Sequence, residues 1–179
     1  MVIVGDTVRW SARITATRYR HPAPHCPLCL GSRLVPQRCQ SHQPILLSRV
    51  DAPNLIVNLG LNAARDMLAG DVTDLTIRYM AWGSSSATPA AGNTTLGSED
   101  GRKAITSRAA GVTGVMVTSV YLAIDDANGV LEELGWFASP TATATTDSGI
   151  MIARALYPGG AETKAADEAI TIDRTDTFA

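Results

Sequence analysis

The sequence predicts a mainly β protein: an antiparallel β-sandwich of jelly-roll type that includes one short α-helix. Its C-terminal third contains short runs that alternate apolar with polar residues and are rich in β-branched side chains. Gly, Asn, Asp, Ser and Pro separate these runs, and this combination is typical of antiparallel strands joined by turns. Hydrophobic residues form 45 % of the chain but aromatic residues only 5 %, so we expect a core of small side chains. The 179 residues are enough for one domain with a core and a small extension.

A long β-hairpin is predicted in the N-terminal part of the chain. Residues 8–17 alternate apolar side chains with Arg, Ser and Thr, which indicates a strand with one buried face. Pro22 and Pro24 end this strand because proline cannot continue an interior ladder, and residues 45–50 supply a return strand. We therefore divide the chain into a hairpin extension, residues 1–50, and a β-sandwich domain, residues 51–179.

The tip of this hairpin carries a metal-binding pattern. Cys26, Cys29, Cys39 and His42 follow the spacing C-x2-C-x9-C-x2-H and include every cysteine of the chain. A two-residue gap lets both ligands of a tight turn reach one ion, and two such turns supply the four tetrahedral ligands that Zn²⁺ prefers. Because a Cys3His set leaves no open coordination position, the pattern predicts a structural Zn²⁺ site in an insertion that resembles a zinc knuckle.

Other interpretations of the cysteine segment stay open. His25 is a rival fourth ligand, and the three cysteines could instead be free or partly oxidised. A zinc-dependent nucleic-acid-binding protein is a further alternative, because arginines such as Arg18 and Arg20 precede the segment. However, the interval between the two ligand pairs is too short for a recognition helix. Residues 26–42 also contain no aromatic side chain for base stacking, so these features argue against nucleic acid as a partner.

The remaining elements follow the hairpin in order. A helix is predicted over residues 59–69, with Asn58 as its N-cap, Gly70 after its last turn, and an apolar stripe that contains Leu61, Ala64 and Leu68. Strands are predicted over residues 75–82, 115–122, 132–137, 149–157 and 169–173. Residues 83–97 form a Gly/Ser/Thr/Pro-rich loop that buries too little apolar area to fold by itself. We expect this loop to be mobile in an isolated subunit and to be ordered by a neighbour in an assembly.

No arrangement of catalytic groups is predicted. Glu132 and Glu133 are adjacent in a strand, so their side chains point to opposite faces and do not form an acid/base pair. The histidines, His21, His25 and His42, all lie in or beside the cysteine segment. None is left for a Ser-His-Asp arrangement elsewhere in the chain. We therefore predict that the protein is not an enzyme.

Residues 54–172 contain an ordered set of features that point to a known family. The features are Asn54-Leu55-Ile56-Val57-Asn58, Arg65-Asp66-Met67-Leu68-Ala69-Gly70, the strand from Leu75 to Trp82, Thr88-Pro89-Ala90-Ala91, Leu96, Glu99, Arg102-Lys103-Ala104-Ile105 and the segment from Glu132 to Phe137. In this order they resemble a family of small bacteriophage virion proteins, and they are similar to the domain that starts some phage tail fibres. The cysteine cluster within residues 1–50 departs from the family pattern.

The resemblance implies a β-sandwich subunit that works as an oligomer in the virion, and a structural role for the acid at Glu132 or Glu133. It favours a tail or neck position, such as a fibre attachment or adaptor protein, whereas the small size makes a capsid decoration (cement) protein the alternative. Expected partners are further copies of the chain, in a trimer or larger homo-oligomer, and other virion proteins.

Composition fits assembly as well. Charged residues form only 18 % of the chain and the net charge is −2, which suits faces that are buried against neighbours. No apolar run is long enough to span a membrane or to act as a signal peptide. We therefore expect no membrane partner, synthesis in the host cytoplasm and localisation in the virion.

Overall fold

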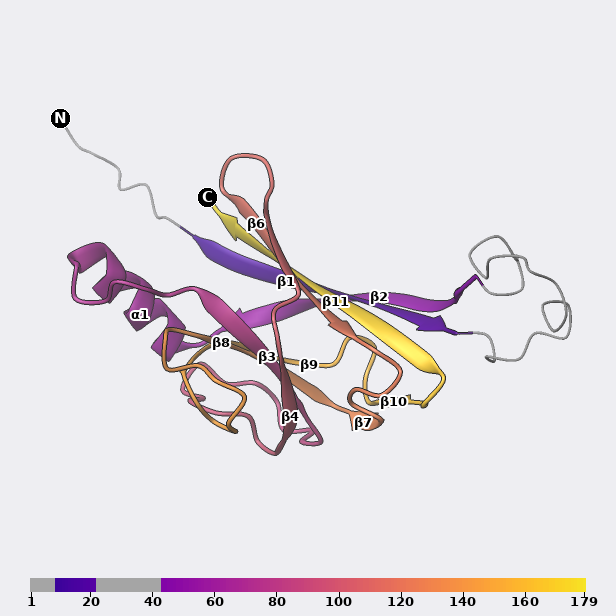
Figure 1. Ribbon diagram of the computed structural model, residues 1–179. Coiled ribbons are helices and arrows are strands. Elements are labelled where there is room, and N and C mark those ends of the chain that lie inside the picture. Colours follow the sequence, from indigo (N-terminus) through magenta and orange to yellow (C-terminus); the bar gives the residue numbers. More distant parts are fainter. Residues whose placement is uncertain (1–8, 22–42) are drawn as a thin grey trace, which may run out of the picture.

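The computed structural model describes residues 9–21 and 43–179. Its main feature is one large, curled antiparallel sheet, with a single helix beside it in the described part of the chain (Figure 1). The prediction of a mainly β protein with one short helix is therefore confirmed.

The sheet contains nine strands. They are β1 (Trp10–Arg20), β2 (Ile45–Ile56), β3 (Ile77–Gly83), β4 (Glu99–Ala104), β5 (Ser107–Ala110), β6 (Val115–Leu122), β8 (Glu133–Ala138), β9 (Ile150–Leu156) and β11 (Glu168–Phe178). Their order across the sheet is β4-β3-β8-β9-β2-β1-β11-β6-β5. Two short strands, β7 (Gly129–Leu131) and β10 (Glu162–Lys164), form a separate ladder, and the helix α1 spans Asn58–Ala69.

The predicted hairpin is formed by β1 and β2, which lie near the middle of the sheet. β1 pairs with β2 on one side and, over all eleven of its residues, with β11 on the other. β2 continues beyond residue 50, and its last residues, Leu55 and Ile56, pair with β9. The predicted boundary between residues 50 and 51 therefore falls inside a strand, and the described part of the hairpin belongs to the main sheet.

The two edge strands of the sheet, β4 and β5, are consecutive in the chain, so the short connection between them holds the two edges close together. β4 pairs with β3 at one edge, and β5 pairs with β6 at the other. Between them, the Ile105 amide donates to the Arg78 carbonyl at 2.9 Å, and the Thr106 amide donates to the Ser119 carbonyl at 2.8 Å. Residues 99–110 thus bridge the two edges, and the sheet curls around an interior.

This interior holds the main hydrophobic core. Trp136, Ile152 and Ile170 are fully or almost fully buried there. A smaller cluster around Phe137 and Met151 lies on the opposite face of β8 and β9. Successive residues of a strand point to opposite faces, so these two strands are covered on both sides.

The helix α1 begins and ends close to the predicted positions, but its N-cap differs. Gly70 follows the last turn with φ of 88°, the left-handed conformation that glycine adopts readily. The N-cap is Val57, not Asn58, and it makes no capping bond through its side chain. A neighbouring loop compensates, because the Asn58 amide donates to the Ala91 carbonyl at 2.8 Å.

The face that α1 buries is also different from the predicted one. Gly60 and Ala63 are the buried residues of the helix, whereas Leu61 is 46 % exposed and Leu68 is 90 % exposed. The reason is the close approach of α1 to β9: a Cβ atom on Gly60 would lie 2.5 Å from the Ile152 carbonyl oxygen. Small residues permit this contact, so the larger apolar side chains are left at the surface.

Replacing Gly60 by Ala is expected to lower the free energy of unfolding by about 1–3 kcal/mol, because the added methyl group forces the helix away from the β9 backbone. Urea unfolding of the variant and the wild type measures this difference. Asn62→Ala, at an exposed position of the same helix, is the control and should change stability by less than about 0.5 kcal/mol. Equal stabilities of the two variants would contradict the predicted contact.

Candidate interaction site

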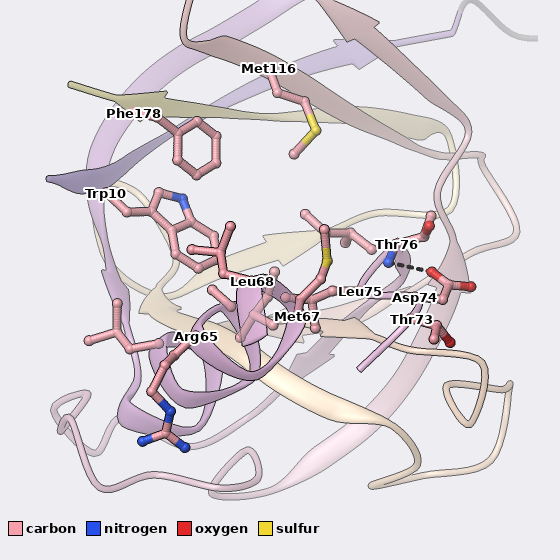
Figure 2. A pocket seen from close by; sticks show the side chains of 14 residues that line it. Trp10, Arg65, Met67, Leu68, Thr73, Asp74, Leu75, Thr76, Met116 and Phe178 are labelled. Carbon is pink, nitrogen blue, oxygen red and sulfur yellow. Dashed lines mark hydrogen bonds between the residues drawn. The ribbon is translucent and has the colours of Figure 1, made fainter. Parts of the chain in front are cut away.

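An apolar groove of about 690 Å³ lies between α1 and the ends of β1, β6 and β11 (Figure 2). Leu68 and Met67 of the helix lie opposite Trp10, Met116 and Phe178 of the strands. The complete lining consists of Trp10, Leu61, Ala64, Arg65, Met67, Leu68, Thr73, Asp74, Leu75, Thr76, Ile77, Met116, Ile152 and Phe178. The predicted stripe of α1 (Leu61, Ala64 and Leu68) therefore lines an open groove and not the core.

The strand wall of the groove is built by register. Trp10 at the start of β1 pairs with Phe178 at the end of β11, and their rings stack with centroids 5.4 Å apart. On the other side of β11, Asp176 pairs with Met116 of β6. Three strands that are distant in sequence thus place large apolar side chains on one side of the groove.

A buried ion pair between Arg174 and Asp176 supports this wall. The Trp10 indole Nε1 donates to Asp176 Oδ1 at 2.7 Å, and the Arg174 guanidinium donates to the same oxygen. Arg174 lies over two rings, 5.8 Å from the centroid of Trp10 and 5.5 Å from that of Trp136. Burial lowers the pKa of Arg174, and the charge of Asp176 opposes this shift. The orientation of Trp10 is therefore set by a charged pair inside the sheet.

The rim of the groove beyond α1 is polar. Hydrogen bonds from Thr76, followed by one from Arg78, lower the pKa of Asp74 to about 2. The Asp74 carboxylate accepts from the Thr76 amide at 2.7 Å and from Arg78 Nη2 at 2.6 Å. Asp74 is therefore ionised at neutral pH and forms a charged border beside the apolar lining.

Loop residues 84–98 are fixed by a buried ion pair between β8 and β9. Arg154 binds Glu133 through Nε at 2.8 Å and Nη2 at 2.7 Å, and the two side chains are 3 % and 0 % exposed. Glu133 also accepts the amides of Gly97 at 3.0 Å and Ser98 at 2.7 Å, whereas Arg154 donates to Asn93 at 2.9 Å. The sequence predicts that this loop is mobile in an isolated subunit. In the structure, Glu133 and Arg154 of the same subunit hold it through hydrogen bonds.

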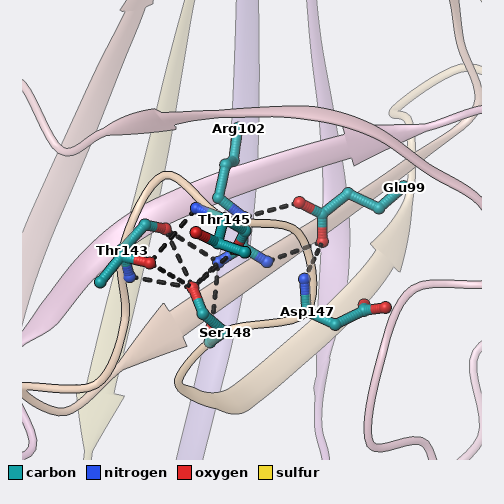
Figure 3. Close-up of polar contacts among 6 residues, drawn as sticks. All are labelled: Glu99, Arg102, Thr143, Thr145, Asp147 and Ser148. Atoms are coloured by element: carbon teal, nitrogen blue, oxygen red, sulfur yellow. Dashed lines mark hydrogen bonds and ion pairs between the residues drawn. The ribbon is translucent and has the colours of Figure 1, made fainter.

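A second buried pair holds residues 139–149 in the same manner (Figure 3). Arg102 binds Glu99 through two hydrogen bonds of 2.6 and 2.7 Å and stacks 4.3 Å from the centroid of the Phe137 ring. Its Nη1 donates to the carbonyls of Thr143 at 3.1 Å and Ser148 at 2.9 Å. Both Gly/Ser/Thr-rich loops are therefore attached to the sheet by charges that water does not reach.

The predicted metal ligands Cys26, Cys29, Cys39 and His42 lie outside the described residues, as does the rival ligand His25. Within residues 9–21 and 43–179, no group of His, Cys, Asp and Glu side chains is arranged to hold a metal ion. The Zn²⁺ site therefore stays a prediction from spacing.

Comparisons with known proteins found no match to a protein family, to a curated protein or to a solved structure. In the part of the chain that the structure describes, no helix is long and apolar enough to cross a membrane.

Sequence reasoning missed both the groove and the ion pairs. One signal was present: Arg154 interrupts the apolar run Ile150–Leu156, and a charge in such a run indicates a buried partner. The groove has no comparable signal, because Leu68 and Phe178 are 110 positions apart (178 − 68) in the chain and meet only in the folded sheet.

Proposed function

We propose that the protein is a non-enzymatic structural subunit of a bacteriophage virion and that it acts by oligomeric assembly. The observation that carries this function is the apolar groove, in which Leu68 is 90 % and Met67 is 48 % exposed. Contiguous apolar surface of this kind is typical of a protein interface. The two loops anchored by buried charges support the same function, because pre-ordered loops lose little entropy when they bind.

The position in the virion follows from the resemblance of residues 54–172 to tail-fibre starting domains. We place the subunit in the tail or neck, as a fibre attachment or adaptor protein, with a capsid decoration protein as the alternative. The jelly-roll sandwich belongs to the same proposal. It is supported by the curling of the sheet, which brings residues of β6, β8, β9 and β11 into one core.

The nucleic-acid-binding alternative has less support. Arg18 and Arg20, the arginines that precede the cysteine segment, form ion pairs with nearby acids. Arg18 binds Glu162, and Arg20 lies 3.3 Å from Asp167 and 3.1 Å from Glu168. Guanidinium groups that are already paired contribute less to phosphate binding.

The oligomeric state tests the proposed function. We expect a trimer or larger homo-oligomer of the full chain by native mass spectrometry, with Leu68→Asp weakening association about 10–100-fold because a buried leucine contributes about 1.5–3 kcal/mol. Asn62→Asp, an exposed position of α1 outside the groove, makes the same charge change and should leave association intact. A wild-type chain that remains monomeric at high concentration would overturn the assembly function.

A further inference from the structure

The groove requires an occupant that is apolar and narrow. One wall is α1, which contributes Leu68, and the other contains the stacked pair Trp10 and Phe178. A helix of twelve residues is about 18 Å long, so an extended segment of about five or six residues would cover its length. The polar rim at Asp74 and Arg65 limits where charged residues of such a segment can lie.

The chain itself contains a segment of this type outside the described ranges. Residues 1–8 begin with the uncharged run Met1-Val2-Ile3-Val4, which is followed by Gly5 and Asp6. The other segment outside the described ranges, residues 22–42, is rich in Pro and Cys, and its longest run of aliphatic side chains is Leu34-Val35, so it matches an apolar groove less well. Eight residues extend up to about 26 Å, which is sufficient to reach across a groove wall and along α1.

We infer that residues 1–8 of a neighbouring copy occupy the groove, with Met1-Val2-Ile3-Val4 against α1. The path of the chain at Arg9 favours a neighbour over the same subunit. The Arg9 amide donates to the Ala179 carbonyl at 2.6 Å, and the Ala179 amide donates to the Arg9 carbonyl at 3.0 Å. Arg9 thus continues the ladder of β1 with β11, so its backbone is held in the strand direction at the end of the sheet. A segment that continues in this direction leads off the end of the sheet, where a neighbouring copy can receive it.

This occupant is assigned on the premise that the groove is the assembly contact proposed above, and two full-chain variants separate the two ideas. Ile3→Asp damages the segment and leaves the groove intact, whereas Leu68→Asp damages the groove and leaves the segment intact. Thr7→Asp, in the same segment but outside the apolar run, and Asn62→Asp are the matched controls. One variant is labelled with ¹⁵N so that native mass spectrometry distinguishes mixed from unmixed pairs.

Each of the two variants alone should associate at least about tenfold more weakly than the wild type, and the controls should not. When Ile3→Asp and Leu68→Asp are mixed, a mixed pair should form, because the intact segment of one chain meets the intact groove of the other. If only Leu68→Asp weakens association, the groove is an assembly contact but residues 1–8 are not its occupant. If both weaken it and no mixed pair forms, exchange between neighbours is wrong. If neither has an effect, the groove is not the assembly contact.

Discussion

Replacing Arg154 by Ala is expected to lower the free energy of unfolding by about 3–5 kcal/mol, the usual cost of removing one partner of a buried ion pair. The remaining partner, Glu133, is 0 % exposed, so its carboxylate would be left in the interior without a counter-charge. Urea unfolding followed by tryptophan fluorescence measures the loss. Hydrogen exchange gives a local readout, because the Gly97 and Ser98 amides that bind Glu133 should exchange faster.

Arg78→Ala is the matched control for this prediction. The Arg78 side chain is 40 % exposed and pairs with Asp74 at the surface, and exposed pairs of this kind contribute about 0–1 kcal/mol. If Arg154→Ala and Arg78→Ala destabilise the protein equally, the pair between β8 and β9 does not fix the loop in the way described.

Replacing Asp176 by Ala is the second change with a large expected effect, again about 3–5 kcal/mol of unfolding free energy. Asp176 and Arg174 are both 0 % exposed, and Arg174 Nε and Nη1 have no hydrogen-bond partner among the described residues. Asp176 is therefore the main compensation for a fully buried positive charge. The change also removes the acceptor of the Trp10 indole, so the side chain of Trp10 in the strand wall of the groove should become less ordered.

Two variants control for this effect. Asp173→Ala lies on the same strand but on the partly exposed face, where the carboxylate accepts only from Ser119 at 2.6 Å among the contacts described; its cost should be about 0.5–1.5 kcal/mol. Asp176→Asn restores an acceptor for the indole but not the charge, so an intermediate loss is expected. A cost for Asp176→Ala as small as that for Asp173→Ala would contradict the buried pair as the support of the groove wall. Tryptophan emission reports the environment of Trp10 in the same samples.

Most elements of the fold were predictable because their signals are local, whereas β4, β5, β7 and β10 were not predicted. Alternation along residues 8–17 and 169–173 identifies the strands β1 and β11, and Gly70 marks the end of α1 through its left-handed conformation. The structural role expected for the acid at 132 or 133 agrees with the place of Glu133, which binds two loop amides and Arg154. Each of these features depends on residue type and spacing within one short segment.

The candidate site was not predictable in the same way. The stripe of α1 predicts a buried face, but Leu61 and Leu68 line an open groove because the tight contact of Gly60 with Ile152 decides how the helix docks. Likewise, the composition of residues 83–97 predicts mobility, whereas the partner that anchors them is an arginine on a strand far along the chain. Neither docking angle nor ion-pair partner is encoded in a local pattern.

The sequence alone therefore indicated the helix and the strands β1, β2, β3, β6, β8, β9 and β11, since backbone conformation and side-chain periodicity respond to neighbouring residues, but it did not indicate β4, β5, β7 or β10. Only the tertiary structure decided which apolar side chains are covered and which charges are buried together. The physical reason is that burial depends on contacts between distant segments: Trp10, Met116 and Phe178 form one wall through the pairing of β1, β11 and β6, and they face Leu68 only when α1 is docked on β9.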